Sequence, residues 1–238
     1  GYYSEEGTAK ANSGVDRFTF RTNLDTQVVD WLKFGANVAL TYSKYQTIVT
    51  GWYTQSPILQ AVTALPYKSP YEIIYNPDGT ISWGDPYEVY PWDNMIDLNQ
   101  YYEKNTNNRQ SMDLMGQTYF LLTPVKGLTI RAQQAVDAYD YTNTSINYPS
   151  YEPYSARGRN GKAFQRYYQL SSTNTAEYKT DINKKHFFAV LAGHESFIRH
   201  QSDFSATGTG LTDDRIVNFG STTDISSWAG NDMECAFN

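Results

Sequence analysis

The fold is indicated by residues 17–42, which read RFTFRTNLDTQVVDWLKFGANVALTY. Over residues 17–29 most apolar side chains fall on even positions and most polar ones on odd positions, and the alternation resumes over residues 32–42 after a break at Asp30 and Trp31. Successive side chains on a strand point to opposite faces, so each run predicts a strand with one apolar and one polar face. Two such strands, closely joined, predict a hairpin of a membrane β-barrel.

Two more hairpins follow along the chain. Residues 109–142 repeat the alternation around a turn at residues 123–127, where a proline fixes one backbone angle and a glycine permits another. Residues 165–200 form a less regular pair, whose return strand is apolar on both faces in its first half. The sequence therefore predicts an all-β fold, a partial transmembrane antiparallel β-barrel of about six strands in three hairpins, over about 16–45, 109–142 and 165–200.

Two long segments separate these hairpins and a third follows the last one, whereas the turn within each hairpin takes a handful of residues. The long segments are residues of about 46–108, 143–164 and 201–238. Outer-membrane barrels have short periplasmic turns and long extracellular loops, so these three segments are predicted to be extracellular loops. In the first loop, Ser56 and Pro57 favour the start of a short helix, and residues 76–79 (NPDG) favour a tight turn. We expect this loop to fold into a compact cap.

Composition narrows the class of protein without deciding it. The chain has 238 residues, with 21 Tyr and 5 Trp against 18% charged residues, a balance found in aromatic-girdled barrels and in glycan-binding β-sandwiches. The net charge of −6, without a basic stripe, argues against a nucleic-acid partner. No apolar stretch approaches the roughly 20 residues of a spanning helix. The lone Cys235 matches no metal-binding or redox spacing.

Several segments resemble one family of proteins. Residues 16–25 (DRFTFRTNLD) and 30–37 (DWLKFGAN) are similar to the early barrel of SusC/RagA-type TonB-dependent outer-membrane receptors. Four later segments follow in the order that this family uses: residues 58–61 (ILQA), 76–80 (NPDGT), 124–129 (PVKGLT) and 191–195 (LAGHE). The resemblance extends from about Asp16 to Phe197, and the last forty or so residues resemble nothing as clearly.

The resemblance implies a location and a task. Such receptors lie in the bacterial outer membrane, and an N-terminal plug fills their 22-stranded barrel. They import oligosaccharides or peptides, a SusD-like surface lipoprotein serves as a lid, and TonB pulls on the plug. Six strands cannot close such a barrel, so we expect an internal barrel piece that lacks the plug and the TonB-binding segment. The implied mechanism is transport in which no covalent bond of the substrate is made or broken, and it uses no cofactor.

The first long loop carries the residues predicted to bind substrate. Sugar recognition favours aromatic faces beside amide and carboxylate groups. The candidates with these side chains are Trp52, Tyr53, Trp83, Asp85, Tyr87, Trp92, Asp93 and Asn94. The alternative interpretation is that they pack the loop, contact the partner lipoprotein or form the outer aromatic girdle.

Charged residues on the polar faces are expected to line the lumen, where water or the plug can satisfy them. They are Arg17, Arg21, Asp25, Arg131, Asp137, Glu177 and Lys179. A polar inner wall is general in large barrels, so these residues alone indicate no specific site.

No catalytic or metal site is predicted. His186, His194 and His200 share a parity, but the outer two would lie about 45 Å apart on an extended strand. The pair His194-Glu195 lacks the second histidine of a zinc-protease motif. The acids near residues 213–214 and 232–234 do not fit the spacing of a calcium-binding loop.

Two alternatives remain open at the level of sequence. A soluble carbohydrate-binding β-sandwich would also use aromatic-rich alternating strands, but it would pack its apolar faces together in a core. Burial of Phe18, Phe34 and Phe120 in a closed interior would therefore contradict the membrane interpretation. A glycoside hydrolase fragment would require two carboxylates that converge in a cleft.

Overall fold

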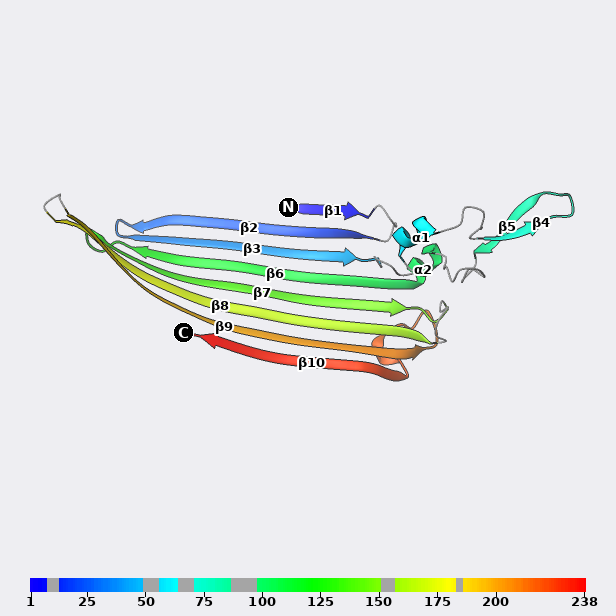
Figure 1. The fold of residues 1–238 in the computed structure, drawn as a ribbon. Helices are drawn as coiled ribbons and strands as arrows, with labels where there is room; N and C mark the ends of the chain where they lie inside the picture. Colours follow the sequence, from blue (N-terminus) through cyan, green and yellow to red (C-terminus); the bar gives the residue numbers. More distant parts are fainter. Residues whose placement is uncertain (8–12, 49–55, 64–70, 87–97, 151–156, 183–185) are drawn as a thin grey trace.

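The computed structural model describes residues 1–7, 13–48, 56–63, 71–86, 98–150, 157–182 and 186–238. Most of them form one eight-stranded antiparallel sheet, in the order β1-β2-β3-β6-β7-β8-β9-β10. These strands are β1 (Tyr2–Glu6), β2 (Gly14–Val29), β3 (Leu32–Gln46), β6 (Asn105–Leu122), β7 (Leu128–Asn147), β8 (Gly158–Ile182), β9 (His186–Leu211) and β10 (Asp224–Phe237). Figure 1 shows a long, curved sheet that does not close on itself. The predicted all-β antiparallel fold is confirmed.

Small elements gather at one end of this sheet. They are α1 (Pro57–Thr63), β4 (Tyr71–Tyr75), β5 (Ile81–Pro86), α2 (Leu98–Lys104) and a 3₁₀ turn, η1 (Phe219–Ser221). Strands β4 and β5 form a separate hairpin, which Figure 1 shows beyond the two helices. Within the described residues, no helix combines the length and the apolar character needed to cross a membrane.

The strands of the sheet differ from the predicted set at both edges. The predicted hairpins correspond to β2–β3, β6–β7 and β8–β9, which pair in antiparallel registers with one irregularity each at Gln27–Val29 and Gly158–Arg159. The prediction that residues 201–238 form a loop was wrong. Strand β9 continues to Leu211, and β10 pairs with it from Asp224 opposite Thr209 to Phe237 opposite Phe197. Strand β8 likewise begins at Gly158, inside the predicted second loop, and β1 adds an eighth strand.

Hydrogen bonding to a neighbour explains these added strands. Residues 201–211 and 224–237 are rich in Ser, Thr, Gly and Asp and lack apolar alternation. A strand at the edge of a sheet needs only a free row of backbone donors and acceptors beside it, whatever its side chains. The alternation of side chains therefore underestimates how far the strands extend.

The even-numbered face of the sheet is largely apolar on β2, β3, β6 and β7, and it is uncovered by other described residues. On this face Phe34 lies opposite Phe120, with ring centroids 5.1 Å apart. Phe18 and Phe120 are 53% and 46% exposed, and Phe34 is half-buried. A β-sandwich would have packed such side chains against a second sheet, so this arrangement contradicts the sandwich alternative and matches a face made for lipid.

A small polar cluster interrupts the apolar face on β7, β8 and β9. It consists of Gln134, Ser172, Asn174 and His194, which lie in facing register positions. Gln134 donates a hydrogen bond to the Ser172 hydroxyl at 2.8 Å, and Asn174 donates to the same hydroxyl at 3.1 Å. Gln134, Ser172 and Asn174 therefore hydrogen-bond to one another within the face, whereas His194 hydrogen-bonds to Asn238. The cluster accounts for the irregular alternation in residues 165–200.

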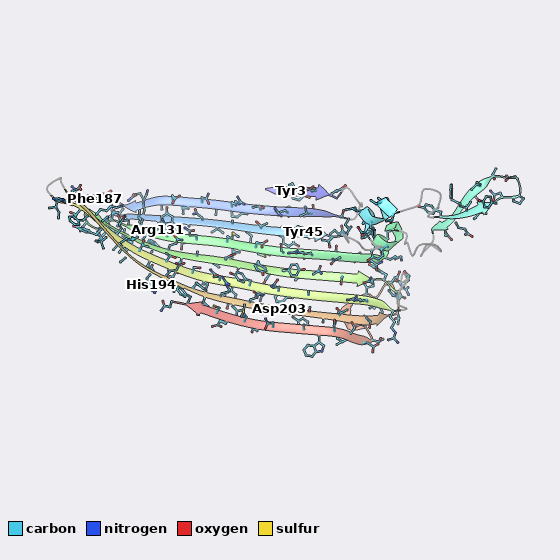
Figure 2. The ribbon with its side chains drawn as sticks, viewed as in Figure 1. Tyr3, Tyr45, Arg131, Phe187, His194 and Asp203 are labelled. Carbon is cyan, nitrogen blue, oxygen red and sulfur yellow. The ribbon has the colours of Figure 1, made fainter. Side chains whose placement is uncertain are left out.

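Side chains project from both faces along the whole length of the strands (Figure 2). Phe187 marks the end where β8 turns into β9, and Tyr45 and Asp203 lie toward the opposite end, where the long connections gather. At the short-turn end, Gly127 has a positive φ of 87°, and its carbonyl accepts a hydrogen bond from the Lys179 backbone at 2.8 Å. The turn between β6 and β7 is thereby fixed against β8.

Candidate functional site

Two of the eight predicted binding residues, Trp83 and Asp85, lie in the described part of the chain. Both are on β5, and Trp83 is 64% exposed. The hairpin that presents them turns at Asn76–Thr80 as predicted, with a backbone hydrogen bond of 3.0 Å from Gly79 to Asn76. The other six candidates, Trp52, Tyr53, Tyr87, Trp92, Asp93 and Asn94, lie outside the described residues.

A second feature, at the end of the sheet with the long connections, ties three of these connections together. The Lys104 ammonium at the end of α2 lies 2.8 Å from the Asp214 carboxylate, in the segment between β9 and β10. The same carboxylate accepts hydrogen bonds from the backbone (2.9 Å) and the hydroxyl of Ser150, just after β7. Partial burial raises the pKa of Asp214, but the hydrogen bonds from Lys104 and Ser150 outweigh it and lower the pKa from 3.8 to about 2. We call this arrangement the Asp214 clamp.

The Asp214 clamp is expected to open in acid. Because its folded-state pKa is lowered, the Asp214 carboxylate stabilises the fold above its ordinary pKa of 3.8, and this contribution is lost as the pH falls from about 4 to about 2. In Asp214→Asn, hydrogen exchange of residues 212–223 is expected to be several-fold faster than in the wild type at pH 6 and equal to it near pH 2. Asp213→Asn is the control, because Asp213 pairs locally with Arg215 at 2.6 Å. Equal exchange in Asp214→Asn and the wild type at pH 6 would show that the clamp contributes nothing.

The odd-numbered face of the sheet is polar, and it carries the charged residues expected to line the lumen. Arg17, Arg21, Asp25, Arg131, Asp137, Glu177 and Lys179 all occupy odd positions in the paired registers. Toward the short-turn end, Arg131 lies over the Tyr119 ring at 4.9 Å, and the Tyr119 hydroxyl donates to Asp25. We call this polar face the inner wall.

The inner wall also carries aromatic and arginine side chains that contact one another in two neighbouring groups. Arg109 lies 5.7 Å from the Tyr45 ring and 4.5 Å from the Tyr141 ring. The second group begins at Tyr139, two residues before Tyr141 on β7. Tyr139 stacks on Tyr167 of β8, with ring centroids 5.2 Å apart and ring planes 20° apart.

The second group continues onto β9 and β10. The Arg199 guanidinium lies 5.8 Å from the Tyr167 ring and 5.8 Å from the Phe197 ring. Phe197 in turn stacks on Phe237 of β10 at 5.6 Å. We call the whole set the aromatic–arginine track: Tyr45, Arg109, Tyr139, Tyr141, Tyr167, Phe197, Arg199 and Phe237.

The arginines of the track are held by rings and amides. Arg199 donates twice to the Gln169 side-chain oxygen, at 3.0 and 3.1 Å, and the Tyr167 hydroxyl donates to the same oxygen at 3.0 Å. Neighbouring Arg17 donates to the Tyr45 hydroxyl at 3.1 Å. Among the described side chains, Arg17, Arg109 and Arg199 form no ion pair with a carboxylate. Their positive charge therefore remains available to a ligand.

Sequence reasoning missed this track because its members lie on six strands and meet only through the register. The available signal was the parity of the aromatics. Tyr45, Tyr139, Tyr141 and Tyr167 stand at odd positions among polar neighbours, where a lipid-facing aromatic has no place.

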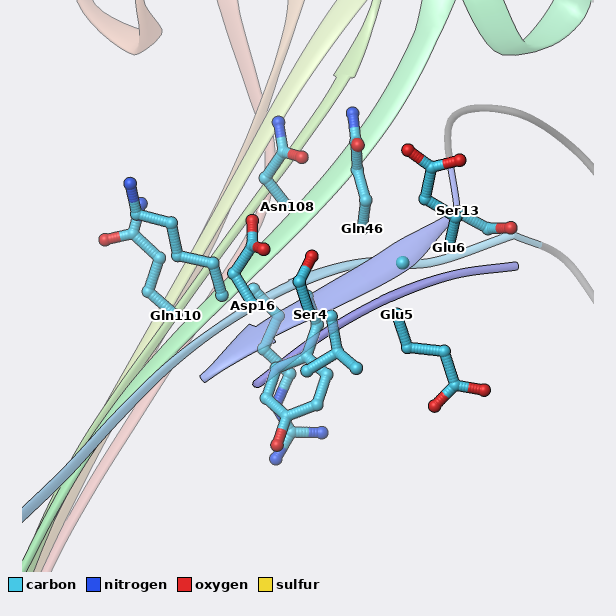
Figure 3. Close-up of a pocket in the computed structure, with 13 residues that line it drawn as sticks. Ser4, Glu5, Glu6, Ser13, Asp16, Gln46, Asn108 and Gln110 are labelled. Carbon is cyan, nitrogen blue, oxygen red and sulfur yellow. The ribbon is translucent and has the colours of Figure 1, made fainter. Parts of the chain in front are cut away.

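A hollow of about 550 Å³ lies near the β1 edge, lined by residues of β1, β2, β3 and β6. Figure 3 shows that its lining comes from both faces of the sheet, because Glu5 projects to one side whereas Asp16, Asn108 and Gln110 project to the other. The hollow therefore wraps around the edge of the sheet and does not form one enclosed binding site.

Two histidines of β9, His194 and His200, have separate partners. His194 hydrogen-bonds to Asn238 at 2.7 Å, and His200 lies 3.0 Å from Asp232 and stacks on Tyr168 at 5.2 Å. Within the described ranges, no group of three or more His, Cys, Asp or Glu side chains is placed to hold a metal ion.

Comparisons with known proteins agree with this architecture. No family model matches the chain. It is similar to the TonB-dependent receptor P26 of Formosa agariphila, with 29% identity over 196 residues, which are 81% of this chain and 18% of that protein.

Solved structures of the RagAB peptide importer have the same fold. The closed-closed state matches 99% of this chain and 26% of its own chain, with 24% identity and a TM-score of 0.79. The open-open state matches 94% of this chain and 25% of its own, also with 24% identity, and a TM-score of 0.77. The chain thus spans about a fifth to a quarter of the length of these proteins. The resemblance to SusC/RagA-type TonB-dependent receptors is confirmed.

Proposed function

We propose that this chain is an internal piece of the barrel of a SusC-like TonB-dependent transporter in a bacterial outer membrane. The observation that carries the proposal is the open eight-stranded sheet, with one uncovered apolar face and one polar face. The similarity to RagAB structures over nearly the whole chain supports the same architecture. In this arrangement the even-numbered face meets lipid and the inner wall faces water or the plug.

The proposed orientation follows from the two ends of the sheet. One end has the short connections, at residues 30–31, 123–127 and 183–185, and the other has the long ones, with α1, α2 and the β4–β5 hairpin. Short turns are periplasmic and long loops extracellular in outer-membrane barrels. The Asp214 clamp and the residues Trp83 and Asp85 therefore belong to the proposed extracellular side.

The complete protein is proposed to import a nutrient. An oligosaccharide is the first candidate and a peptide is the alternative. Substrate binds among the extracellular loops and the inner wall, a SusD-like lipoprotein closes over it, and TonB acts on a plug to open a passage. Aromatic side chains on both the β4–β5 hairpin and the inner wall support an oligosaccharide. RagAB is described as a peptide importer, so the peptide alternative remains in the test. No bond of the substrate is made or broken in this mechanism.

Fractionation of the native cells tests the proposal. The complete protein is expected in the outer membrane, soluble only with detergent, and bound to a surface lipoprotein. Its deletion is expected to abolish growth on one class of oligosaccharide and to leave growth on monosaccharides unchanged. Recovery of the protein as a soluble periplasmic monomer would overturn the proposal. Hydrolysis of a glycan panel by the purified protein would instead favour the hydrolase alternative.

A further inference from the structure

We propose that the aromatic–arginine track binds an acidic oligosaccharide on the inner wall. Sugar rings would stack on its tyrosines and phenylalanines, and carboxylate or sulfate groups would pair with Arg109 and Arg199. This inference rests on the proposed function, since it names the substrate class of that transporter and a place where it binds.

The first argument is the position of the aromatic rings. Flat rings on a polar wall form an amphipathic surface, and the apolar face of a sugar ring can lie on it while the sugar hydroxyls bond to nearby amides. Gln169 lies within the track, hydrogen-bonded to Tyr167 and Arg199. The rings are accessible to solvent, because Tyr139 and Tyr167 are only half-buried and Phe237 is 56% exposed.

The second argument is the charge of the track. Each of its two arginines lies within 6 Å of two aromatic rings, and neither forms an ion pair within the described residues. Contacts with rings fix the plane of a guanidinium while its edge keeps donors for a carboxylate or sulfate. A charge held in place without a counter-ion favours an anionic ligand over a neutral one.

The third argument is the distance between the two arginines. Arg109 is on β6 and Arg199 on β9, three strand spacings away. The register places Arg109 level with Ser205 of β9, and Arg199 is six residues from Ser205 along that strand. Standard strand geometry places their backbones about 25 Å apart. One ligand can therefore meet both only if it is an extended oligomer, and the stacked rings of Tyr139 and Tyr167 lie between the two ends.

An oligosaccharide suits this surface better than a peptide. Peptides commonly add a strand to a free sheet edge, but the backbone groups beneath the track are already paired within the ladders of β6 to β9. The wall therefore offers side chains only, and the track brings rings, an amide and arginines together. The carboxylates of Asp113 and Asp137, which face Tyr139 and Gln169 in the register, form no ion pair with Arg109 or Arg199 within the described residues.

Binding to the purified complete receptor in detergent tests this inference. The probes are an oligogalacturonate as the carboxylate source, a carrageenan oligosaccharide as the sulfate source, a cello-oligosaccharide as the neutral control and an acidic peptide. Arg109→Gln and Arg199→Gln are each expected to weaken binding of at least one acidic oligosaccharide about tenfold or more at low salt, which corresponds to about 1.4 kcal/mol. The loss is expected to shrink at high salt, and binding of the neutral probe is expected to stay unchanged.

Matched variants separate binding from folding. Arg21→Gln removes an arginine from the same face outside the track and is expected to leave the affinity unchanged. Tyr167→Ala is expected to weaken acidic and neutral probes alike, because it removes a stacking surface. Arg199→Lys keeps the charge and provides a folded variant for the same measurement if Arg199→Gln fails to fold, and heat-modifiable migration on gels reports folding in each case. An intermediate affinity of Arg199→Lys is the expected result.

Three outcomes would overturn the inference. They are equal affinities in the track variants and Arg21→Gln, binding of the acidic peptide alone, or no binding of either acidic oligosaccharide by the wild type. If the protein still imports a nutrient across the outer membrane in these cases, the proposed function stands and the track has another role. If the protein is not in the outer membrane, the proposed function itself fails.

Discussion

Val38→Lys is expected to lower the free energy of unfolding of the complete protein by about 2–4 kcal/mol, because it places a charge on the face that meets lipid. Val38 is on the even-numbered face of β3, between Thr22 of β2 and Gly116 of β6. A strand needs roughly 9–11 residues to cross the hydrocarbon core of a membrane. Val38 lies near the middle of such a stretch when it is counted from Leu32, the first residue of β3. Urea unfolding in lipid vesicles, followed by tryptophan fluorescence, measures the change.

The next residue provides the matched control. Ala39 is also small and apolar, but it lies on the inner wall, opposite Arg21 and Met115. Ala39→Lys is expected to cost less than about 1 kcal/mol, since water or a plug can satisfy a charge there. Equal losses for the two substitutions, or a larger loss for Ala39→Lys, would contradict the assignment of the faces.

Gly35→Val is expected to lower the free energy of unfolding by about 1–3 kcal/mol through overpacking. Gly35 lies between Asp25 and Tyr119 in the register of β2, β3 and β6. A Cβ atom there would collide with the Tyr119 ring and come within 2.7 Å of the Asp25 carboxylate. The ring must then move, and the hydrogen bond from Tyr119 to Asp25 breaks.

Two further variants locate the cause of this loss. Gly193→Val changes another inner-wall glycine, whose Cβ would meet only ordinary contacts at 3.6 and 3.8 Å, and it is expected to be nearly neutral. In a Tyr119→Ala background, Gly35→Val is expected to cost clearly less than in the wild type, because the obstructing ring is gone. An unchanged cost in that background would show that the ring is not the obstacle.

Alternation along the chain was enough to predict the apolar and polar faces of β2, β3, β6 and β7. Each of these faces is a local property of the sequence, because side chains two apart on a strand share a face. Strand β10 escaped prediction since its even positions include Trp228, Asp232 and Glu234, which give no consistent face. Its position depends on pairing with β9, and pairing between distant segments leaves no local pattern.

The aromatic–arginine track could not be derived from the sequence for the same reason. Arg109 and Tyr141 are distant in the chain, and only the register of β6 with β7 brings the guanidinium within 4.5 Å of the ring. The predicted loop residues followed composition instead. Loops rich in Trp and Asp suggest sugar binding wherever they occur, whereas the placement of Trp83 and Asp85 depends on the β4–β5 pairing.

Strands β8 and β9 have 25 and 26 residues, far more than a lipid bilayer requires. At about 3.3 Å per residue and a tilt of about 40°, β9 rises about 65 Å along the barrel axis, of which the apolar band covers about 25 Å. In the proposed orientation most of the remainder stands as a collar above the lipid headgroups, since the β8–β9 hairpin extends only a short way past the start of β7, where Leu128 pairs with Tyr178. A bulky protein can then dock on the rim without pressing against the bilayer, and a long polymer can enter the collar end-on before it nears the membrane plane.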